Sequence, residues 1–474
     1  MIHINTNIPS MVAARILSAQ NNRLNLSLER LGTGLRINTG KDDPAGLIAS
    51  EALRAQQVAI GAAINNVGRA NNVVASAEGG LDEISRLLTD LEDLVDRSAN
   101  EAAISDDEAA ANQLEIDAVL DSINRIASNT EFQGRKLLNG ELDYTTSGVS
   151  NADFSDVQIN SAKITAGGYR TVVVEVTASA QLGALAYGAS ATGAGTTTLE
   201  ITGNYGTENL SFASGTAIAT IANAVNNSKD LTGVSAVVTG ASELTFYSTD
   251  YGSNQFVSVQ ALEGSFTVTG GDAGSNKDYG RDATVNVNGV TAITDGLSAR
   301  LQTSTLAAEL ELSVAFGTAT GTSTFEVTGG GADFMISPTI SLSGLASLGI
   351  GAVSTSSLGS GAVGYVSSLG SGQTNSIASK NFAIAQRIIR VAQTKVSELR
   401  GRLGAFQKDT LTTTGNSLGV TLENITAAES NIRETDFAEE TSNLTRRQIL
   451  VQAATSVLQV ANAQPQQALA LLNG

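Results

Sequence analysis

The chain has 474 residues, with 28 lysines and arginines against 46 aspartates and glutamates, so its net charge of −18 would repel nucleic acid over most of its surface. It has no cysteine and only one histidine, His3, which excludes thiolate nucleophiles, cysteine-rich metal sites and most imidazole acid–base chemistry. We therefore expect a protein that binds no nucleic acid, cofactor or metal ion and that is not an enzyme.

The first 40 residues predict an amphipathic helix whose apolar stripe is formed by Ile8, Val12 and Ile16. The N-terminus lacks the basic and continuous apolar segments of a secretory signal, so we expect any export to proceed without a cleaved signal peptide. The segment also carries an excess of arginine, which suits a membrane surface or charge matching between subunits, and we favour the subunits. The arginines are Arg15, Arg23, Arg30 and Arg36.

The next segment has the strongest periodicity, because apolar residues alternate in steps of three and four from Leu53 to Val95. This stripe predicts one continuous helix about 65 Å long, at 1.5 Å per residue. Asp42-Asp43-Pro44 marks its start, since a carboxylate can cap free N–H groups and proline needs no hydrogen-bond partner there. The predicted core positions are Leu53, Ile60, Val67, Val74, Leu81, Ile84, Leu88, Leu91 and Val95.

Two further helices complete a predicted bundle. One begins at Ser105, where a capping-box pattern places the carboxylates of residues 106–108 at the positive end of the helix dipole. A cation site is the alternative reading of these carboxylates, and we favour capping. The other helix repeats the alternation of three and four residues between Ala385 and Phe406. Its predicted core positions are Ile389, Val396, Leu399 and Leu403.

The middle of the chain, residues 141–375, has a different composition. Short alternating runs at 171–176, 199–201 and 266–269 predict strands separated by glycine-rich turns, and a short helix is expected near Ile218–Val225. This stretch holds six cations against 19 acidic residues. We expect it to be a solvated, outward-facing β-rich region.

The last segment, from about residue 436, again predicts an amphipathic helix. Its final 27 residues carry no charge, but polar side chains interrupt them too often for a membrane span, so we expect a buried protein contact and no membrane insertion. Two isolated terminal helices would leave most of their apolar surface in water. We predict that both ends are largely disordered in the free monomer and fold when subunits associate. The predicted polymerisation contacts are Ile8, Val12, Ile16, Leu450, Ala454, Val457 and Ala461.

Five runs at the two ends carry a family resemblance. They are RINTGKDDPAGLI at 36–48, RSAN at 97–100, FQGRKLL at 132–138, AESNIRETDF at 428–437 and QALALL at 467–472. Together they resemble bacterial flagellin, over about half of the chain. The centre is only loosely similar to the inserted modules of some flagellins.

The resemblance implies a subunit that polymerises into the flagellar filament used for swimming, outside the cell. It also implies type III export without a cleaved signal, an export chaperone on the C-terminal segment, assembly under a cap, and hook-associated junction proteins as neighbours. Head-to-tail contacts that do not close into a ring agree with this, since they generate helical polymers. The alternatives are a hook–filament junction protein and an exported adhesin with a helical stalk.

The predicted fold class is α+β, with long terminal helices in coiled-coil or bundle layers and a β-rich centre. Residues 1–42 with 436–474 are expected to form the inner filament core. Residues 43–140 with 376–435 form the helical bundle domain, with adjoining strands from about 141–180. Residues 181–375 form a variable β-rich outer region.

The resemblance finally implies a contact with an innate immune receptor. In flagellins that the receptor senses, an Arg and a Leu on the bundle helix and a Glu on the next helix carry that contact. The Leu corresponds to Leu94 and the Glu to Glu115, but the Arg position holds Asp90. Because an anion in place of a cation reverses the sign of the contact, we predict weak or absent receptor activation.

Overall fold

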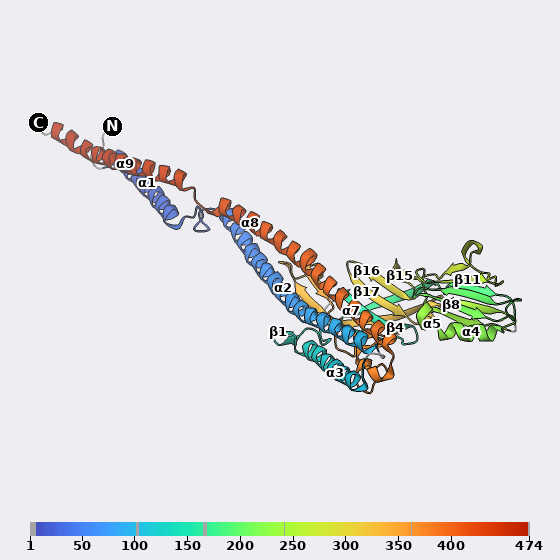
Figure 1. Ribbon diagram of the computed structural model, residues 1–474. Coiled ribbons are helices and arrows are strands. Elements are labelled where there is room, and N and C mark those ends of the chain that lie inside the picture. Colours follow the sequence, from blue (N-terminus) through green and yellow to red (C-terminus); the bar gives the residue numbers. More distant parts are fainter. Residues whose placement is uncertain (1–5, 101–103, 165–167, 241, 362, 473–474) are drawn as a thin grey trace. The chain divides into compact units, whose positions relative to one another are not determined.

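The computed structural model describes residues 6–100, 104–164, 168–240, 242–361 and 363–472 (Figure 1). Long helices from both ends of the chain and a β-rich centre make the fold α+β, as predicted. The contacts divide the chain into two units. Unit one holds Met1–Gly68, Ile336–Thr339 and Thr412–Gly474, and unit two holds Arg69–Met335 and Ile340–Leu411.

Unit one is built from helices. In Figure 1, α1 and α9 lie side by side. The start of α2 confirms the sequence prediction, because the Asp43 carboxylate accepts a hydrogen bond of 2.9 Å from the backbone N–H of Gly46 in its first turn. The helices are α1 (Ile8–Thr33), the first part of α2 (Pro44–Ser98), α8 (Thr413–Arg433) and α9 (Phe437–Leu472).

Unit two contains the predicted bundle. The rest of α2 packs with α3 (Asp106–Asn129) and α7 (Phe382–Ala405), and α7 runs into a π-helical segment, Phe406–Thr412. The Ser105 hydroxyl accepts from the backbone N–H of Glu108 at 3.2 Å, which confirms the predicted cap. Three short helices are α4 (Ile218–Asn227), which confirms the expected central helix, α5 (Lys229–Thr232) and α6 (Val314–Gly317). Four 3-10 turns are η1 (Asp272–Gly274), η2 (Leu342–Gly344), η3 (Val366–Leu369) and η4 (Ile377–Ser379).

Two antiparallel sheets of unit two share one core, in the strand orders β14-β13-β5-β18-β3 and β15-β16-β17-β4. Alternate valines of β5 face this core, and the Phe154 ring meets the Phe325 ring edge-on at 5.6 Å between centroids. The strands are β3 (Tyr144–Ser147), β4 (Phe154–Ala162), β5 (Arg170–Ala178), β13 (Thr284–Val287), β14 (Val290–Thr291), β15 (Ile293–Asp295), β16 (Ser298–Gln302), β17 (Leu306–Leu312) and β18 (Gly321–Gly330).

A second β core, also in unit two, is formed by sheets β6-β10-β9 and β12-β11-β7-β8 together with α4. Its strands are β6 (Ala184–Tyr187), β7 (Thr197–Thr202), β8 (Thr207–Phe212), β9 (Val234–Val238), β10 (Leu244–Ser248), β11 (Phe256–Glu263) and β12 (Lys277–Tyr279). The smaller pairs are β1 (Glu131–Phe132) with β2 (Arg135–Lys136), β19 (Ala332–Met335) with β20 (Leu345–Leu348), and β21 (Gly359–Ser360) with β22 (Gly364–Tyr365).

The strand predicted at 266–269 is wrong. The segment forms only one isolated bridge, between Thr269 and Ala186, and glycines on both sides end the pairing. Its alternation reflects burial instead, since Phe266 and Val268 both enter the second β core, where the Phe266 ring stacks on Tyr187 at 3.7 Å. Burial of every second side chain therefore does not require a strand ladder.

Candidate functional site

The seam between α1 and α9 is made of small side chains. Ala13, Ala454 and Ala461 are buried there, and Ser27 is fully buried. Small side chains allow two helices to approach closely, because the interaxial distance depends on the side chains at the contact. Ala454 and Ala461, which the periodicity predicts as contacts between subunits, both lie inside this seam of their own chain.

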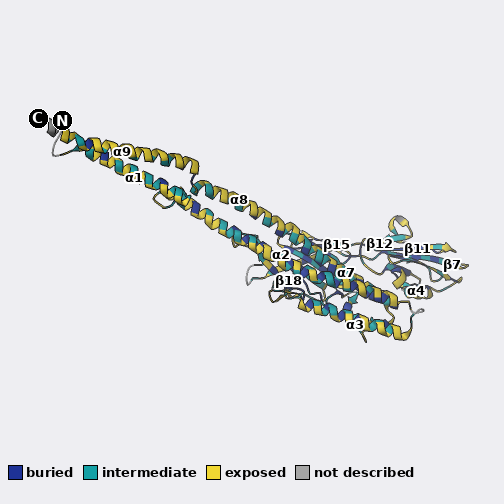
Figure 2. Cartoon of the chain, turned by 60° about the vertical axis from the view of Figure 1, so that its left-hand side comes forward, coloured by how far each residue is buried: buried dark blue, intermediate teal, exposed yellow. Residues whose placement is uncertain are grey.

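Large apolar side chains of the same two helices point away from the seam. Ile8, Val12, Ile16, Leu450 and Val457 are each between 40% and 58% exposed, and exposed positions cover much of α9 in Figure 2. Soluble monomers rarely leave large contiguous apolar patches in water, so a surface of this kind indicates a protein contact. Three further members of this surface were not predicted from the sequence, although their spacing on the helices follows the same face: Met11, Ile449 and Val460.

Polar contacts fix the register of the helix pair near the chain ends. The Asn7 carboxamide caps α1 by accepting from the backbone N–H of Ser10 at 3.1 Å, and it donates to the Ala461 carbonyl at 2.8 Å. The Ser10 hydroxyl lies 2.6 Å from the Asn462 side-chain oxygen. One residue therefore both starts α1 and ties it to α9.

A buried charge cluster lies further along the seam. The Ser27 hydroxyl donates to the Glu440 carboxylate, with Arg30 at 3.7 Å and Arg447 at 3.9 Å from the same carboxylate. Glu440 is 6% exposed. A buried carboxylate is tolerated only with such partners, because desolvation of an unpaired charge is costly.

Two of the four N-terminal arginines thus act within the chain. Arg30 pairs with Glu440, and the Arg36 guanidinium donates to the Ile432 carbonyl. The hypothesis of charge matching between subunits is wrong for Arg30, because its oppositely charged partner comes from the other end of the same chain, and it stays a prediction for Arg36.

In unit two the predicted bundle core is buried. Every predicted position from Val74 to Val95 on α2 and from Ile389 to Leu403 on α7 is at most 5% exposed. In unit one, Ile60 and Val67 are buried and Leu53 is half-buried. Ion pairs join α2 to α7 at the rim of the bundle, between Asp82 and Arg400 at 2.9 Å and between Glu92 and Arg390 at 3.4 Å.

Asp90, Leu94 and Glu115, the positions that the resemblance relates to an immune-receptor contact, lie in two different environments. Asp90 and Glu115 are exposed, whereas Leu94 is 5% exposed and packs inside the bundle. The two carboxylates are therefore accessible from outside the molecule, and the Leu94 side chain is not.

A polar cavity of about 310 Å³ lies between α7, β4 and the loop around residue 353. Burial raises the pKa of the Asp143 carboxyl, although the backbone N–H of Tyr144 stabilises its anion. Burial also lowers the pKa of the Arg402 guanidinium on the same wall.

Among the described residues, no group of three or more His, Cys, Asp or Glu side chains is arranged to hold a metal ion. No described helix has the length and apolarity needed to cross a lipid bilayer.

Family models and relatives of similar sequence agree with this architecture. Residues 4–143 match the model of the bacterial flagellin N-terminal helical region, 386–472 that of the C-terminal helical region, and 198–250 that of the flagellin hook IN motif. Flagellin C of Vibrio cholerae serotype O1 is 30% identical over 99% of both chains, and flagellin D of Vibrio anguillarum is 28% identical over 99% of both. FliC of Burkholderia pseudomallei is a solved structure that is 17% identical over 71% of this chain and 98% of that chain, with a TM-score of 0.25.

Full-length similarity to filament proteins does not favour the two alternatives, a junction protein or an adhesin. The chain belongs to the flagellin family: it is a structural protein and not an enzyme, the subunit of the extracellular bacterial flagellar filament that drives swimming.

Proposed function

We propose that the exposed apolar faces of α1 and α9 are the surfaces through which this flagellin polymerises. The observation that supports this is the division of side chains on the helix pair, with small residues in the seam and large apolar residues outside it. At about 25 cal/mol per Å², covering such a surface favours assembly, and part of the gain is offset by ordering the ends of the chain. Assembly and the ordering of both ends then form one transition.

The same reasoning extends to the arrangement of the filament. We propose that residues 1–42 with 436–474 line its inner core, that 43–140 with 376–435 form the next layer, and that 181–375 project outward. The acidic character of the central region supports its outward position, because charge favours contact with water.

The remaining partners follow from the family. We propose that a chaperone holds the C-terminal segment before export, that export needs no cleaved signal, and that cap and junction proteins contact the same terminal helices. The uncharged run from Gln448 onward supports a chaperone contact, because its apolar residues need cover before assembly.

Seeded growth observed by electron microscopy tests the proposed contacts. We expect the full chain to extend short filament seeds into long homopolymers. Removal of residues 1–33 and 437–474 is expected to abolish growth while the melting transition of the central region is unchanged. Undiminished growth of the truncated chain is the result that refutes this role for the terminal helices.

A further inference from the structure

A cleft lies at one end of the bundle in unit two, between α2, the β1–β2 hairpin and β19. Its cavity has a volume of about 230 Å³, and its walls include Phe132 and Phe334. The Phe334 ring is held by the Phe406 ring, 5.9 Å away between centroids. Gln133 and Gly134 have φ angles of 52° and 81°, which allow the tight turn that carries Phe132 to the wall. We call this cavity the hairpin cleft.

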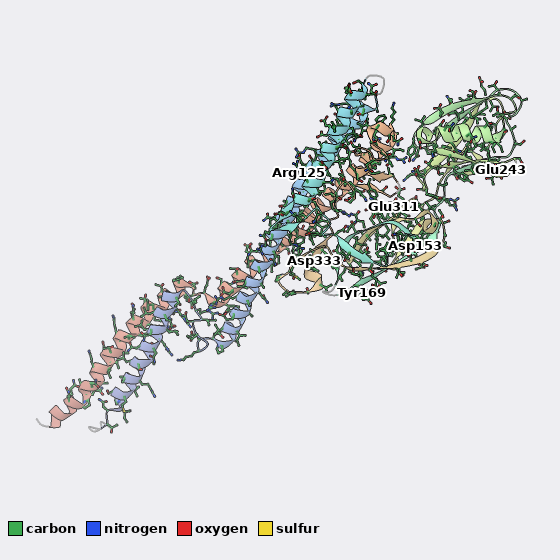
Figure 3. The ribbon with its side chains drawn as sticks, turned by 90° about the horizontal axis from the view of Figure 1, so that it is seen from below. Arg125, Asp153, Tyr169, Glu243, Glu311 and Asp333 are labelled. Carbon is green, nitrogen blue, oxygen red and sulfur yellow. The ribbon has the colours of Figure 1, made fainter. Side chains whose placement is uncertain are left out.

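Two cations border the hairpin cleft. Arg69 of α2 and Arg135 of β2 are exposed, and within the described part of the chain neither makes an ion pair. The adjacent Lys136 differs, because it pairs with Glu131 at 2.6 Å. Asp333, labelled in Figure 3, is the one acidic residue on the wall of the cleft. The cleft thus combines an apolar interior with an excess of positive charge, in a chain whose net charge is −18.

The exposed face of α3 in the same bundle has the complementary features. Leu114 on α3 is 70% exposed and lies next to Glu115, with Ala111 and Ala118 on the same helix face. One large apolar side chain therefore projects from a face of small residues beside a carboxylate. The dipole of α3 explains acidic residues in its first turn, but Glu115 lies beyond that turn, where the effect has fallen off.

The two surfaces cannot meet within one molecule. The β1–β2 hairpin begins directly after α3, so Leu114 and Glu131 are separated by about 25 Å along the helix at 1.5 Å per residue. Two different patches on one molecule make a heterologous contact, which builds a helical filament when the rotation between copies does not close a ring.

We propose that the hairpin cleft of one copy receives Leu114 of a second copy, with Arg69 and Arg135 facing Glu115. The proposal rests on the self-association described above and adds a contact outside the terminal helices. Apolar burial of Leu114 supplies affinity, and the charge pairs set orientation and register. The partner is therefore the exposed α3 face of an identical chain.

Charge reversal at each end tests the contact. The cleft variant R69E/R135E and the α3 variant A111K/E115K, each alone, are expected to slow seeded elongation about tenfold or more, since like charges then meet. An equimolar mixture of the two variants should elongate, because each cleft then finds an α3 face of opposite charge. The quadruple variant, with both ends reversed, should also elongate by itself. Recovery in both cases establishes that the two patches touch.

Three possible causes of slow elongation must be told apart: misfolding of a variant, failure of the proposed polymerisation, and failure of the contact between the hairpin cleft and α3. Both variants should keep the wild-type circular dichroism and melting transition of the monomer. Reversal of two exposed acidic residues of the outer region, D230K/E243K, should leave elongation unchanged. Wild-type protein that does not elongate overturns the proposed function itself. If wild-type protein elongates, either of two results overturns only this contact. One is normal growth of both single-end variants, and the other is the absence of recovery in the mixture and in the quadruple variant.

Discussion

Glu440 accepts a hydrogen bond from the Ser27 hydroxyl at 2.5 Å, which joins residues 413 positions apart in the sequence inside the seam of the two terminal helices. Arg30 and Arg447 lie within 4 Å of the same carboxylate, so the seam contains a closed polar cluster among alanines. Such a cluster specifies one register of α9 against α1, because a shifted register would bury the carboxylate without partners.

Glu440→Gln tests this cluster. The amide leaves both arginines without a counter-charge in the seam, which we expect to weaken helix pairing by about 2 kcal/mol. The thermal depolymerisation midpoint of filaments should fall, while melting of the central region stays constant. Glu439→Gln, at an exposed neighbouring position, serves as the control and should change neither.

Val457→Asp tests the outer face of α9. Val457 is 58% exposed in the single chain, and a carboxylate there would be buried without a partner once a second copy covers it. We expect seeded polymerisation to stop and the free subunit to keep its circular dichroism spectrum. Val237→Asp, at a similarly exposed position on β9, should polymerise normally. Normal filaments from Val457→Asp contradict the proposed contact.

Asp282 gives a prediction about pH. Burial raises the pKa of its carboxyl, but the Ser253 hydroxyl and the backbone N–H groups of Gly296 and Ser253 donate to it and together hold the pKa below its usual value. A carboxyl with a lowered folded-state pKa stabilises the fold above its unfolded-state pKa of about 3.9, and this stabilisation is lost as pH falls through the folded-state value.

We therefore expect Asp282→Asn to lower the free energy of unfolding of the β region by about 1 to 2 kcal/mol at pH 7, because its amide cannot accept all three hydrogen bonds. The difference from wild type should shrink below pH 4. Denaturant titrations at pH 7, 5 and 3 measure this. Asp230→Asn, an exposed control, should show no such dependence, and a constant difference at all three values contradicts the assignment.

Receptor recognition provides the last test. Asp90 is exposed at the position where the family resemblance implies a cation, so we expect purified monomer to activate the receptor weakly or not at all. Asp90→Arg should raise the response about tenfold in a reporter assay, since it restores the favourable sign of the contact. Glu243→Arg in the outer region controls for net charge. A full-strength response to wild-type protein contradicts the prediction.

The sequence predicted the features that depend on neighbouring residues. Pro44 and Ser105 mark helix starts through local hydrogen bonding, and the apolar alternation between Leu53 and Val95 identifies one helix face. These signals lie within a few residues of one another, so they can be read without knowing the fold.

Features that depend on distant segments could not be predicted. Strand β5 pairs with β13 and β18, more than 100 residues further along, and its alternation indicates a buried face but not a partner. The choice between Ala454 and Val457 as seam or outer residue follows from the approach of α1, which periodicity does not contain. The hairpin cleft likewise needs α2, β1, β2 and β19 to meet.

The Ser27–Glu440 hydrogen bond also has a consequence for synthesis, because its two partners are made at widely separated times. A ribosome that adds about 5 to 20 residues per second needs roughly 20 to 80 s to reach Glu440 after Ser27 has been made. Throughout that interval the residues of α1 have been made without those of α9, so the seam between the two helices cannot form within the molecule until synthesis is nearly complete.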